Sequence, residues 1–296
     1  MTTVTVTNEF LSRAIRAHDF SPHSKPLVIG ISGPQGSGKS YVTEQVHTLL
    51  QNEFSNLNIV QFLMDDLYLT HADQAALTQR AKSELDDNRL LQGRGLPGTH
   101  DIELGIHIFD SIIQSRISGK LASPIKIPSY DKSLFAGEGD RDDPAQWQTI
   151  ENPIDVVLFE GWFNGFMPLD PDQLRIKYLG SSSAALIRHK FPHIEDVNEN
   201  LFQYTKIWNH FDKFVCLETA NISDVYTWRL QQEHALVART GSGMSDSQVE
   251  AFVDRYMPVY ELYYTNMCAR GVSDATNSNL RIGVDLERVV QLSTAW

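Results

Sequence analysis

The feature that most constrains this chain is the segment Gly33–Ser40, which matches the phosphate-binding pattern G-x-x-x-x-G-K-[ST]. An apolar run at 26–31 precedes it, and a helix-like run at 41–50 follows it. This order predicts a buried parallel strand, a tight turn and a helix whose N-terminus faces an anion. The alternative is a glycine-rich turn with an incidental lysine, and the flanking patterns argue against it. The sequence therefore predicts a nucleoside-triphosphate site.

Each position of this segment has an expected part in holding the nucleotide. The glycines let backbone N–H groups turn inward around a phosphate, Lys39 offers a positive charge to the β- and γ-phosphate oxygens, and Ser40 is suited to Mg²⁺. The expected nucleotide-binding residues are Gly33, Pro34, Gln35, Gly36, Ser37, Gly38, Lys39 and Ser40. The N-K-x-D pattern of guanine-binding proteins is absent, which favours ATP as the nucleotide.

Composition narrows the class of protein. The 296 residues are 42% hydrophobic and 21% charged, as expected for a large α/β domain with insertions. A formal net charge of -12 argues against nucleic acid or an anionic membrane as partner, because both attract basic surfaces. The sequence shows no signal peptide and no run of eighteen apolar residues, so we expect a cytoplasmic protein. It leaves the oligomeric state open.

The two cysteines, Cys216 and Cys268, are far apart in the sequence and lack a C-x-x-C spacing. Neither a zinc site nor a disulfide framework is expected from them.

Strand and helix patterns alternate along the chain and predict an α/β fold, with a mainly parallel sheet covered by helices on both faces. We expect one domain spanning residues 1–296. Its expected parts begin with an N-terminal extension at 1–25 that holds a helix at 9–18, and the expected strands lie at 58–64, 154–161, 213–218 and 280–284. Acceptor-binding insertions are expected at 72–150, with helices at 72–91 and 102–118, an edge strand at 124–128 and an irregular stretch at 129–149. A lid and long helices are expected at 224–267, the second of them at 247–267 with a kink at Pro258, followed by a terminal helix at 286–292.

Phosphoryl transfer also needs a metal position, a base and cations. Glu160 ends a predicted buried strand, where a Walker-B carboxylate usually lies, and is expected to hold Mg²⁺ together with Ser40. Asp65 and Asp66 end the second predicted strand at the same edge of the sheet. Because successive strand residues point to opposite faces, we expect one of them to act as the base and the other to cap the next helix or bind the acceptor.

Further polar residues are candidates for the lid and the acceptor site. Arg229 and Arg239 lie on a predicted helix before the flexible segment 241–243, as expected for lid cations that act with Lys39 in catalysis, although paired arginines also occur on solvated helices. Arg94 and His100, in a glycine-rich loop, are expected to bind the acceptor. Asp101 in the same loop is either a third acceptor ligand or the N-cap of the following helix.

Trp162, Phe163 and Phe166 follow Glu160 in the sequence. They either line the acceptor pocket or pack beneath a loop, which is the commoner fate of such residues.

Taken together, these motifs resemble the P-loop kinases of the phosphoribulokinase, uridine kinase and pantothenate kinase superfamily, and most closely its glycerate 3-kinase-like branch. The resemblance runs from about residue 26 to 290. Its marks are GPQGSGKS at 33–40, MDDLYLT at 64–70, GRGLPGTHD at 93–101, IPSYDKSLFAGEGDR at 127–141, VVLFEGW at 156–162 and two helical segments at 228–233 and 244–263.

The resemblance implies a P-loop fold, ATP, Mg²⁺ and a small-molecule acceptor, with D-glycerate as the closest analogy. By the family pattern D-x-[FL]-Y, Asp65 matches the base, while Asp66 and Tyr68 of the same motif are expected at the acceptor. Glu160 matches the acid of the family's E-G motif.

Three functions compete on the sequence alone: a small-molecule kinase, an NTP-driven ATPase or switch, and a protein with a vestigial phosphate loop. Intact Lys39 and Ser40 argue against the third. An acceptor pocket would separate the first from the second, and within the first a nucleoside or a pantothenate-like acceptor is the alternative to a hydroxy acid.

Overall fold

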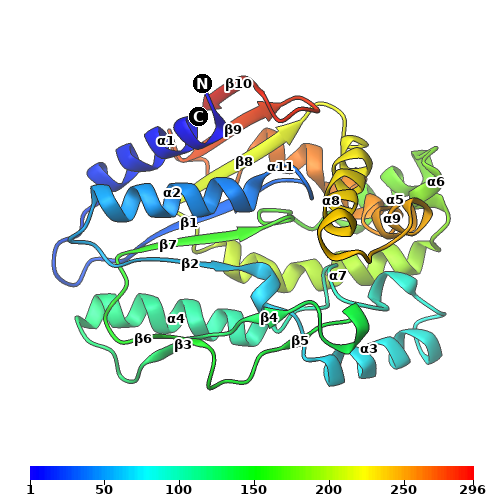
Figure 1. Cartoon of the computed structure of the whole chain (residues 1–296), viewed down its shortest axis with the longest axis horizontal. Helices are drawn as coiled ribbons and strands as arrows, with labels where there is room; N and C mark the ends of the chain where they lie inside the picture. Colours follow the sequence, from blue (N-terminus) through cyan, green and yellow to red (C-terminus); the bar gives the residue numbers. More distant parts are fainter.

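The central sheet of the computed structural model, which describes all 296 residues, has six strands in the order β10-β9-β8-β1-β7-β2 (Figure 1). The strands are β1 (Leu27–Ser32), β2 (Ile59–Leu63), β7 (Val156–Gly161), β8 (Lys213–Thr219), β9 (Asn279–Val284) and β10 (Val290–Ala295). Neighbours pair in parallel except β10, which is antiparallel to β9. The predicted mainly parallel α/β fold is therefore confirmed.

The register of the three inner strands decides where the site forms. Every residue of β1 and β7 is buried, as expected for apolar strands with both faces covered. Ile31 of β1 and Leu63 of β2 both pair with Glu160 of β7. The segments that follow β1 and β2 therefore leave the sheet on either side of Glu160, at the carboxyl edge where open α/β sheets bind ligands.

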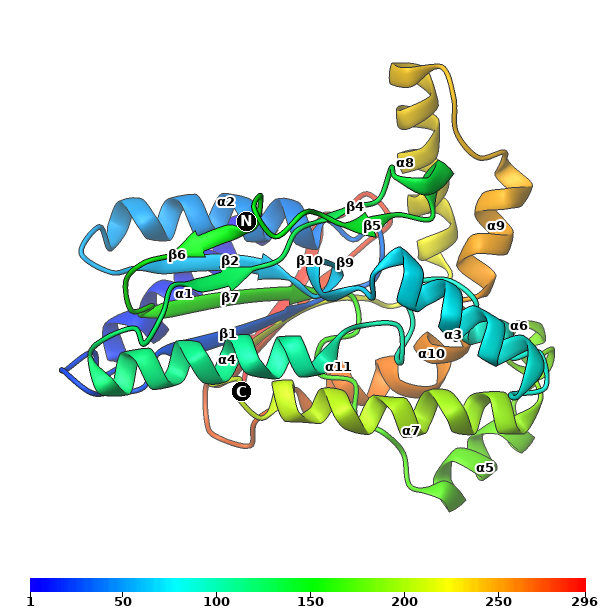
Figure 2. The same cartoon turned by 90° about the horizontal axis from the view of Figure 1, so that it is seen from below.

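Helices cover the two faces of the sheet (Figures 1 and 2). On one face lie α1 (Thr3–Ala17) and α2 (Lys39–Glu53), and on the other α4 (Ile102–Ser118) and α7 (Phe191–Trp208). The helix α1 begins earlier than expected because the Thr2 side chain caps it by accepting a hydrogen bond from the Thr5 N–H. Its buried Phe10 and Leu11 join the hydrophobic core, so the N-terminal segment is packed against the domain.

The insertions between β2 and β7 are mostly short elements. They comprise η1 (Met64–Leu67), α3 (His71–Ser83), η2 (Arg89–Leu91), β3 (Ile125–Ile127), β4 (Tyr130–Asp131), η3 (Phe135–Gly137), β5 (Asp140–Arg141) and β6 (Gln148–Ile150). Two small sheets, β3 with β6 and β4 with β5, replace the irregular stretch expected after residue 128. The helix expected at 72–91 ends early because Asp86 and Asp87 adopt positive φ angles, which a right-handed helix excludes.

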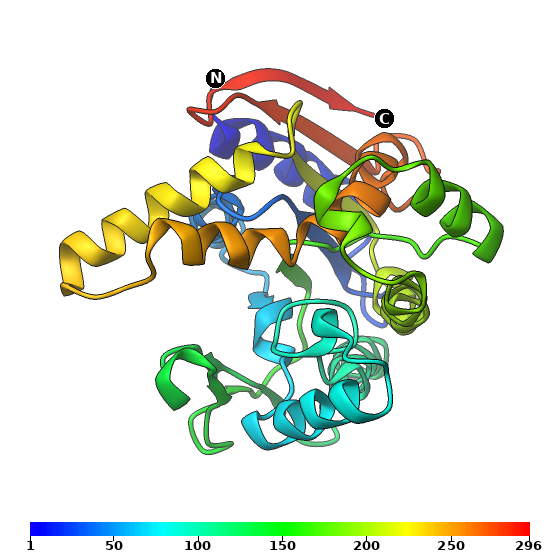
Figure 3. The ribbon, with the colours of Figure 1, turned by 90° about the vertical axis from the view of Figure 1, so that its right-hand side faces the viewer.

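The remaining helices follow β7 and β8. They are α5 (Pro171–Gly180), α6 (Ala184–Ile187), α8 (Asp224–Thr240), α9 (Asp246–Asp254), α10 (Met257–Val259), η4 (Tyr260–Tyr264) and α11 (Thr265–Arg270). The helices α8 and α9 project from the sheet as a pair (Figures 2 and 3). The long helix expected at 247–267 is broken, because Pro258 lacks an N–H and begins a new turn that leads into the π-helical η4.

The terminal helix expected at 286–292 was wrong, since the chain turns back after β9 and forms β10. The turn closes through the Asp285 N–H, which donates to the carbonyl of Val289, and through Arg288 in a left-handed conformation. Pairing with β9 satisfies backbone groups that an open sheet edge would leave free. No helix of the chain combines the length and the apolar character that crossing a bilayer requires.

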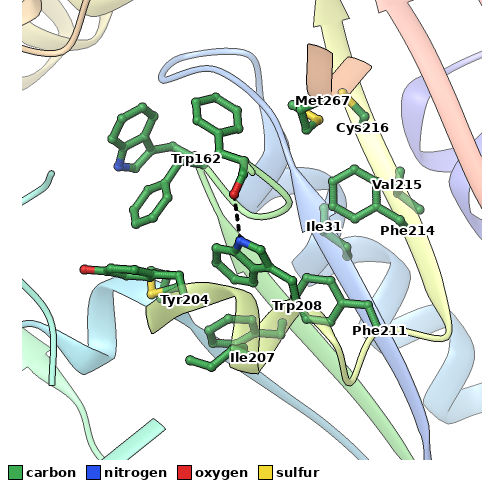
Figure 4. Close-up of a cluster of buried hydrophobic side chains, with 14 of the residues drawn as sticks. Ile31, Trp162, Tyr204, Ile207, Trp208, Phe211, Phe214, Val215, Cys216 and Met267 are labelled. Carbon is green, nitrogen blue, oxygen red and sulfur yellow. Dashed lines mark hydrogen bonds between the residues drawn. The ribbon is translucent and has the colours of Figure 1, made fainter. Parts of the chain in front are cut away.

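One hydrophobic core of 65 buried residues includes side chains from the sheet and from the helices on both faces. Around Trp208, the rings of Phe163, Tyr204 and Phe211 pack together, and the indole N–H donates to the carbonyl of Phe166 at 2.9 Å (Figure 4). Gly30 of β1 is needed here, because a Cβ atom would lie 2.5 Å from the ring of Phe211.

The two cysteines lie close together in this core, which sequence distance did not indicate. The Sγ atoms of Cys216 on β8 and Cys268 on α11 are 3.4 Å apart, and both are free, buried thiols (Figure 4 labels Cys216). The hydrogen bond with the Cys268 thiol, together with burial, raises the pKa of Cys216. The pair is therefore a packed and unreactive part of the core.

Gly36→Ala should destabilise the protein more than Gly241→Ala does. Both glycines have a left-handed φ, so both changes carry the same backbone strain of about 1 kcal/mol. At Gly36 the new Cβ would also lie 2.4 Å from the Cβ of Trp228, whereas nothing lies within 4 Å at Gly241. We expect an additional loss of about 1 to 3 kcal/mol in the free energy of unfolding, measured by urea titration. Equal losses would show that Trp228 moves aside freely.

Candidate active site

The phosphate-binding loop connects β1 to the N-terminus of α2. Gly36 and Gly38 have φ angles of 83° and 92°, which L-residues with side chains rarely adopt. No side chain caps the N-terminus of α2, so its first backbone N–H groups are available to an anion. The Ser37 hydroxyl is buried without a hydrogen-bond partner. The loop therefore presents unpartnered backbone and side-chain donors where the sequence pattern expects a phosphate group.

Glu160 lies at the end of β7 and contacts two residues of the loop. Its carboxylate accepts a hydrogen bond from the Ser40 hydroxyl at 2.8 Å and lies 3.6 Å from the Lys39 ammonium nitrogen. The Glu160 side chain is only 5% exposed. The structure thus brings together the three residues expected at the metal and the phosphates.

The donor set fits Mg²⁺ that arrives with a nucleotide. No group of three or more His, Cys, Asp or Glu side chains in the chain is placed to hold a metal ion alone. Ser40 and Glu160 supply two hard oxygen ligands, and Mg²⁺ usually completes its shell with water and phosphate oxygens.

A cavity of about 500 Å³ opens above this loop. It lies between the α8–α9 pair and the segments that carry Tyr68, Arg94 and Lys132, which Figure 3 shows above and below the sheet edge. Five basic and two acidic side chains line it: Lys39, Arg94, Lys132, Arg229 and Arg255, with Asp65 and Glu160. A larger hollow of about 630 Å³ beside α4 is lined by none of the predicted site residues.

Asp65 faces this cavity, and both of its carboxylate oxygens have partners. The Tyr68 hydroxyl donates to Oδ1 at 2.8 Å, and the Lys132 ammonium group donates to Oδ2. Burial alone would raise the pKa of Asp65, but the charge of Lys132 and these hydrogen bonds lower it below its ordinary value. Asp65 is therefore ionised at neutral pH, as a general base must be.

Asp66 points away from the cavity and caps the turn η1. Its Oδ2 accepts a hydrogen bond from the Leu63 N–H at 2.8 Å, and it is absent from the cavity lining. The expectation that Asp66 reaches the acceptor is therefore corrected. The chain leaves the extended conformation at Met64, so the helical turn η1 directs the two carboxylates. Of the two roles left open for this pair, the structure places the capping one at Asp66.

Two more residues expected at the acceptor lie behind the cavity wall. His100 is buried against Tyr68, its Nδ1 is 2.8 Å from the Tyr204 hydroxyl, and burial lowers its pKa to about 3. Asp101 is the N-cap of α4, accepting from the Leu104 N–H at 3.0 Å, and its other oxygen bonds Arg141. Neither lines the cavity. Both carboxylate oxygens of Asp101 have partners in the protein, whereas His100 Nε2 is buried without one.

Arg94 does line the cavity, and it also ties two segments together. Its Nη1 donates to the carbonyls of Gly137, at 2.7 Å, and Glu138. The backbone carbonyl of Arg94 in turn accepts from Arg255. Arg94 thus lies at the cavity with one side of its guanidinium already bonded to the protein, and its part in binding an acceptor stays a prediction.

The two expected lid arginines differ in placement. Arg229 of α8 lines the cavity, where it lies 5.1 Å from the Phe252 ring centre and 3.7 Å from Glu233, and its Nε is buried without a partner. Arg239 lies in the last turn of α8, exposed and outside the cavity lining. The structure therefore does not bring Arg239 to the site, because the helix runs outward from the sheet before it (Figure 2).

Of the three aromatic residues after Glu160, only Trp162 lines the cavity; Phe163 and Phe166 are fully buried in the core.

Two cations that line the cavity, Lys132 and Arg255, were not predicted from the sequence as site residues. Lys132 lies within the family-like segment 127–141, but nothing local links it to Asp65, 67 residues away. Arg255 directly follows α9, and its guanidinium donates to the carbonyls of Leu90, Gly93 and Arg94.

The fold is a mainly parallel sheet with a phosphate-binding loop and a buried carboxylate beside it, and an ionised aspartate lies across a cationic cavity. These features define a P-loop phosphotransferase. A comparison with protein-family models found no match. "Probable ATP-dependent kinase TDA10" of Saccharomyces cerevisiae is 38% identical over 294 residues, 98% of this chain and 95% of that protein. The chloroplastic D-glycerate 3-kinase of Arabidopsis thaliana is 36% identical over 265 residues, 89% of this chain and 53% of the plant protein.

Among solved structures, D-glycerate 3-kinase from Cryptococcus neoformans var. grubii aligns with a TM-score of 0.83 and 36% identity, covering 100% of both chains. The chain therefore belongs to the family of P-loop kinases that includes TDA10 and D-glycerate 3-kinase, and it is an ATP-dependent small-molecule kinase.

Ionisation of Asp66 should lower the free energy of unfolding as the pH rises toward neutrality. Burial, with the charges of Asp65 and Glu160, raises the pKa of Asp66 to about 7 from an ordinary value of 3.8. Between these values the folded state binds the extra proton, so raising the pH lowers stability through this group. Asp66→Asn keeps an acceptor for Leu63 and does not titrate. The melting temperature of Asp66→Asn minus that of the wild type should therefore increase from about pH 4 to about pH 7, as measured by calorimetry.

The matched control is Glu44→Gln, which removes an exposed carboxylate from α2. Its melting temperature should follow the wild type across this range. A constant difference between Asp66→Asn and the wild type would contradict the shifted pKa.

Proposed function

We propose that this kinase transfers the γ-phosphoryl group of ATP to the 3-hydroxyl of D-glycerate. The observation that carries the proposal is the ionised Asp65 at the cavity opposite the phosphate-binding loop, with Lys132 and Arg94 beside it. A base next to cations suits an acceptor that carries both a hydroxyl and a carboxylate. A neutral acceptor would leave Arg94 without an anionic partner, because its guanidinium bonds only backbone carbonyls of the protein.

Charge distribution supports an anionic acceptor as well as an anionic nucleotide. The chain has a formal net charge of -12, so its overall field repels anions. Basic side chains in the cavity outnumber acidic ones, and they lie on both sides of it. In this proposal Lys39 and Arg229 serve the triphosphate, while Lys132 and Arg94 serve the acceptor. The insertions at 72–150 then form the acceptor side, and 224–267 the lid.

Mg²⁺ is part of the proposal. Ser40 and Glu160 would hold it, and it would neutralise charge on the phosphate oxygens. The chain's own residues then have separate tasks: the loop N–H groups orient the phosphates, and Asp65 accepts a proton.

The transfer balances without a further reactant. The acceptor hydroxyl oxygen forms a bond to the γ-phosphorus, and the bond from that phosphorus to the β–γ bridging oxygen breaks. ADP leaves with the electron pair, and the hydroxyl proton passes to Asp65. The Tyr68 hydroxyl and the Lys132 ammonium group each donate to one carboxylate oxygen of Asp65, which leaves a further lone pair on each oxygen for this proton.

The relatives support the choice of acceptor. Both the plant and the Cryptococcus proteins are named D-glycerate 3-kinases, and the second aligns over the whole of this chain. TDA10 is named only as an ATP-dependent kinase. The cytoplasmic location expected from the sequence stays a prediction.

The acceptor is tested by coupled ADP release with Mg²⁺ and ATP present. D-Glycerate should stimulate release far above the rate without acceptor, while glycerol, uridine and pantothenate should not, because they lack the compact carboxylate and hydroxyl pair. Stimulation by pantothenate or uridine alone would retain the kinase and overturn the glycerate assignment. Equal ADP release with and without every acceptor would favour an ATPase.

Asp65→Asn should lower turnover roughly 10²- to 10⁴-fold while ATP affinity is kept, as expected when a general base is lost. Asp66→Asn is the matched control, since it changes the neighbouring carboxylate that caps η1. Steady-state kinetics and ATP calorimetry on folded variants separate the two effects. If Asp66→Asn proves the more damaging, Asp65 is not the base.

A further inference from the structure

Lys132 is the one cation in contact with the proposed base, and its position is unusual. It comes from the hairpin of β4, η3 and β5, residues 130–141, which we call the flap. Its ammonium group bonds Asp65 Oδ2 and no other group of the protein. The Lys132 side chain is 55% exposed and that of Asp65 is 27% exposed. An ion pair so open to water is weak, and a competing anion can displace it.

This contact weakens the chemistry proposed for Asp65. Tyr68 donates to Oδ1 and Lys132 to Oδ2, so each oxygen keeps a further lone pair for an acceptor hydroxyl. The charge of Lys132, however, lowers the pKa of Asp65 and makes it a weaker base. Tyr68 is buried and directly follows the turn that carries Asp65, so its hydrogen bond is the more permanent of the two. Lys132 is therefore the partner whose departure strengthens the base.

We propose that Lys132 selects the acceptor by exchange: it covers Asp65 in the empty enzyme and moves to the carboxylate of an arriving acceptor. The inference rests on the proposed function and deepens it. Binding of the acceptor carboxylate then removes the charge of Lys132 from Asp65 Oδ2, which leaves the carboxylate better able to take the hydroxyl proton. A neutral polyol leaves Lys132 on Asp65 and is turned over poorly.

The flap is built so that only the lysine side chain needs to move. Arg94 bonds the carbonyls of Gly137 and Glu138. His71 stacks on Phe135 with ring centres 3.7 Å apart and also bonds the Glu138 carboxylate. These contacts fix the flap against α3 and the 93–98 loop. The four-carbon stem of a lysine supplies the remaining reach.

Several charged or titratable groups surround Asp65. They are Lys132 on the flap, Tyr68 and Asp66 on η1, Lys39 on α2, His100 in the loop before α4, and, near Lys132 and Asp66, Glu160 on β7 and Arg94. His100 is uncharged near neutral pH because burial lowers its pKa to about 3. Lys132 makes the largest favourable contribution to the Asp65 carboxylate, so its departure raises the pKa of Asp65 and makes it a stronger base.

The test compares Lys132→Met with the wild type on D-glycerate and its uncharged amide. In the variant the KM for D-glycerate should rise about 10- to 100-fold, the effect of losing one charge-assisted hydrogen bond. The rate with the amide should not fall, so the preference for D-glycerate shrinks by the same factor. The acid limb of kcat/KM should move to higher pH, because Asp65 loses the charge that lowers its pKa.

Lys126→Met is the matched control. Lys126 lies on β3, exposed, with its ammonium group on the carbonyl of Pro144 at 3.1 Å and outside the cavity lining. It should leave the KM, the acceptor preference and the pH profile unchanged. If Lys132→Met also leaves all three unchanged while the wild type phosphorylates D-glycerate, the exchange is overturned and the proposed function stands.

A measurement without turnover keeps the two proposals separate. The side-chain carboxyl ¹³C resonance of Asp65, assigned by its loss in Asp65→Asn, reports its pKa directly. D-Glycerate should raise that pKa in the wild type and have no such effect in Lys132→Met. A titration unchanged by D-glycerate overturns the exchange. Absence of D-glycerate-dependent ADP release from the wild type overturns the proposed function.

Discussion

The buried carboxylate of Glu160 is the constraint on which the site depends. The register of β1, β7 and β2 places it between the phosphate-binding loop and the turn that carries Asp65. An isolated carboxylate at this depth would be strongly unfavourable, so Ser40 and Lys39 must remain within reach of it. These contacts hold the N-terminus of α2 against β7, next to the strand pair that carries the proposed base.

Much of this arrangement could be predicted from local pattern. The helix α4 was expected at 102–118 and lies there, because Asp101 caps its start and Gly119, with φ 73°, ends it. The strand β2 was also correctly expected, but the choice between Asp65 and Asp66 was not decidable. Strand alternation stops at Leu63, and a 3₁₀ turn then directs both carboxylates. The rule of alternating faces does not apply to a turn.

Contacts between distant segments could not be predicted in this way. Asp101 bonds Arg141 across 40 residues, and Cys216 meets Cys268 across 52. The chain near each residue has no periodicity that indicates its partner. The terminal strand β10 is a similar case, since a short apolar run suits a helix or a strand, and the open edge of β9 decided between them.

Three cations of the cavity share a property that links fold to function. Lys39 lies 3.6 Å from Glu160, Arg229 lies 3.7 Å from Glu233, and Lys132 forms an open pair with Asp65. Each of these three is therefore held at the cavity by an acidic side chain. Arg94 and Arg255 differ, because backbone carbonyls hold them. Cations placed in advance need little rearrangement when phosphates and acceptor arrive, which is the condition for electrostatic stabilisation of a phosphoryl-transfer transition state.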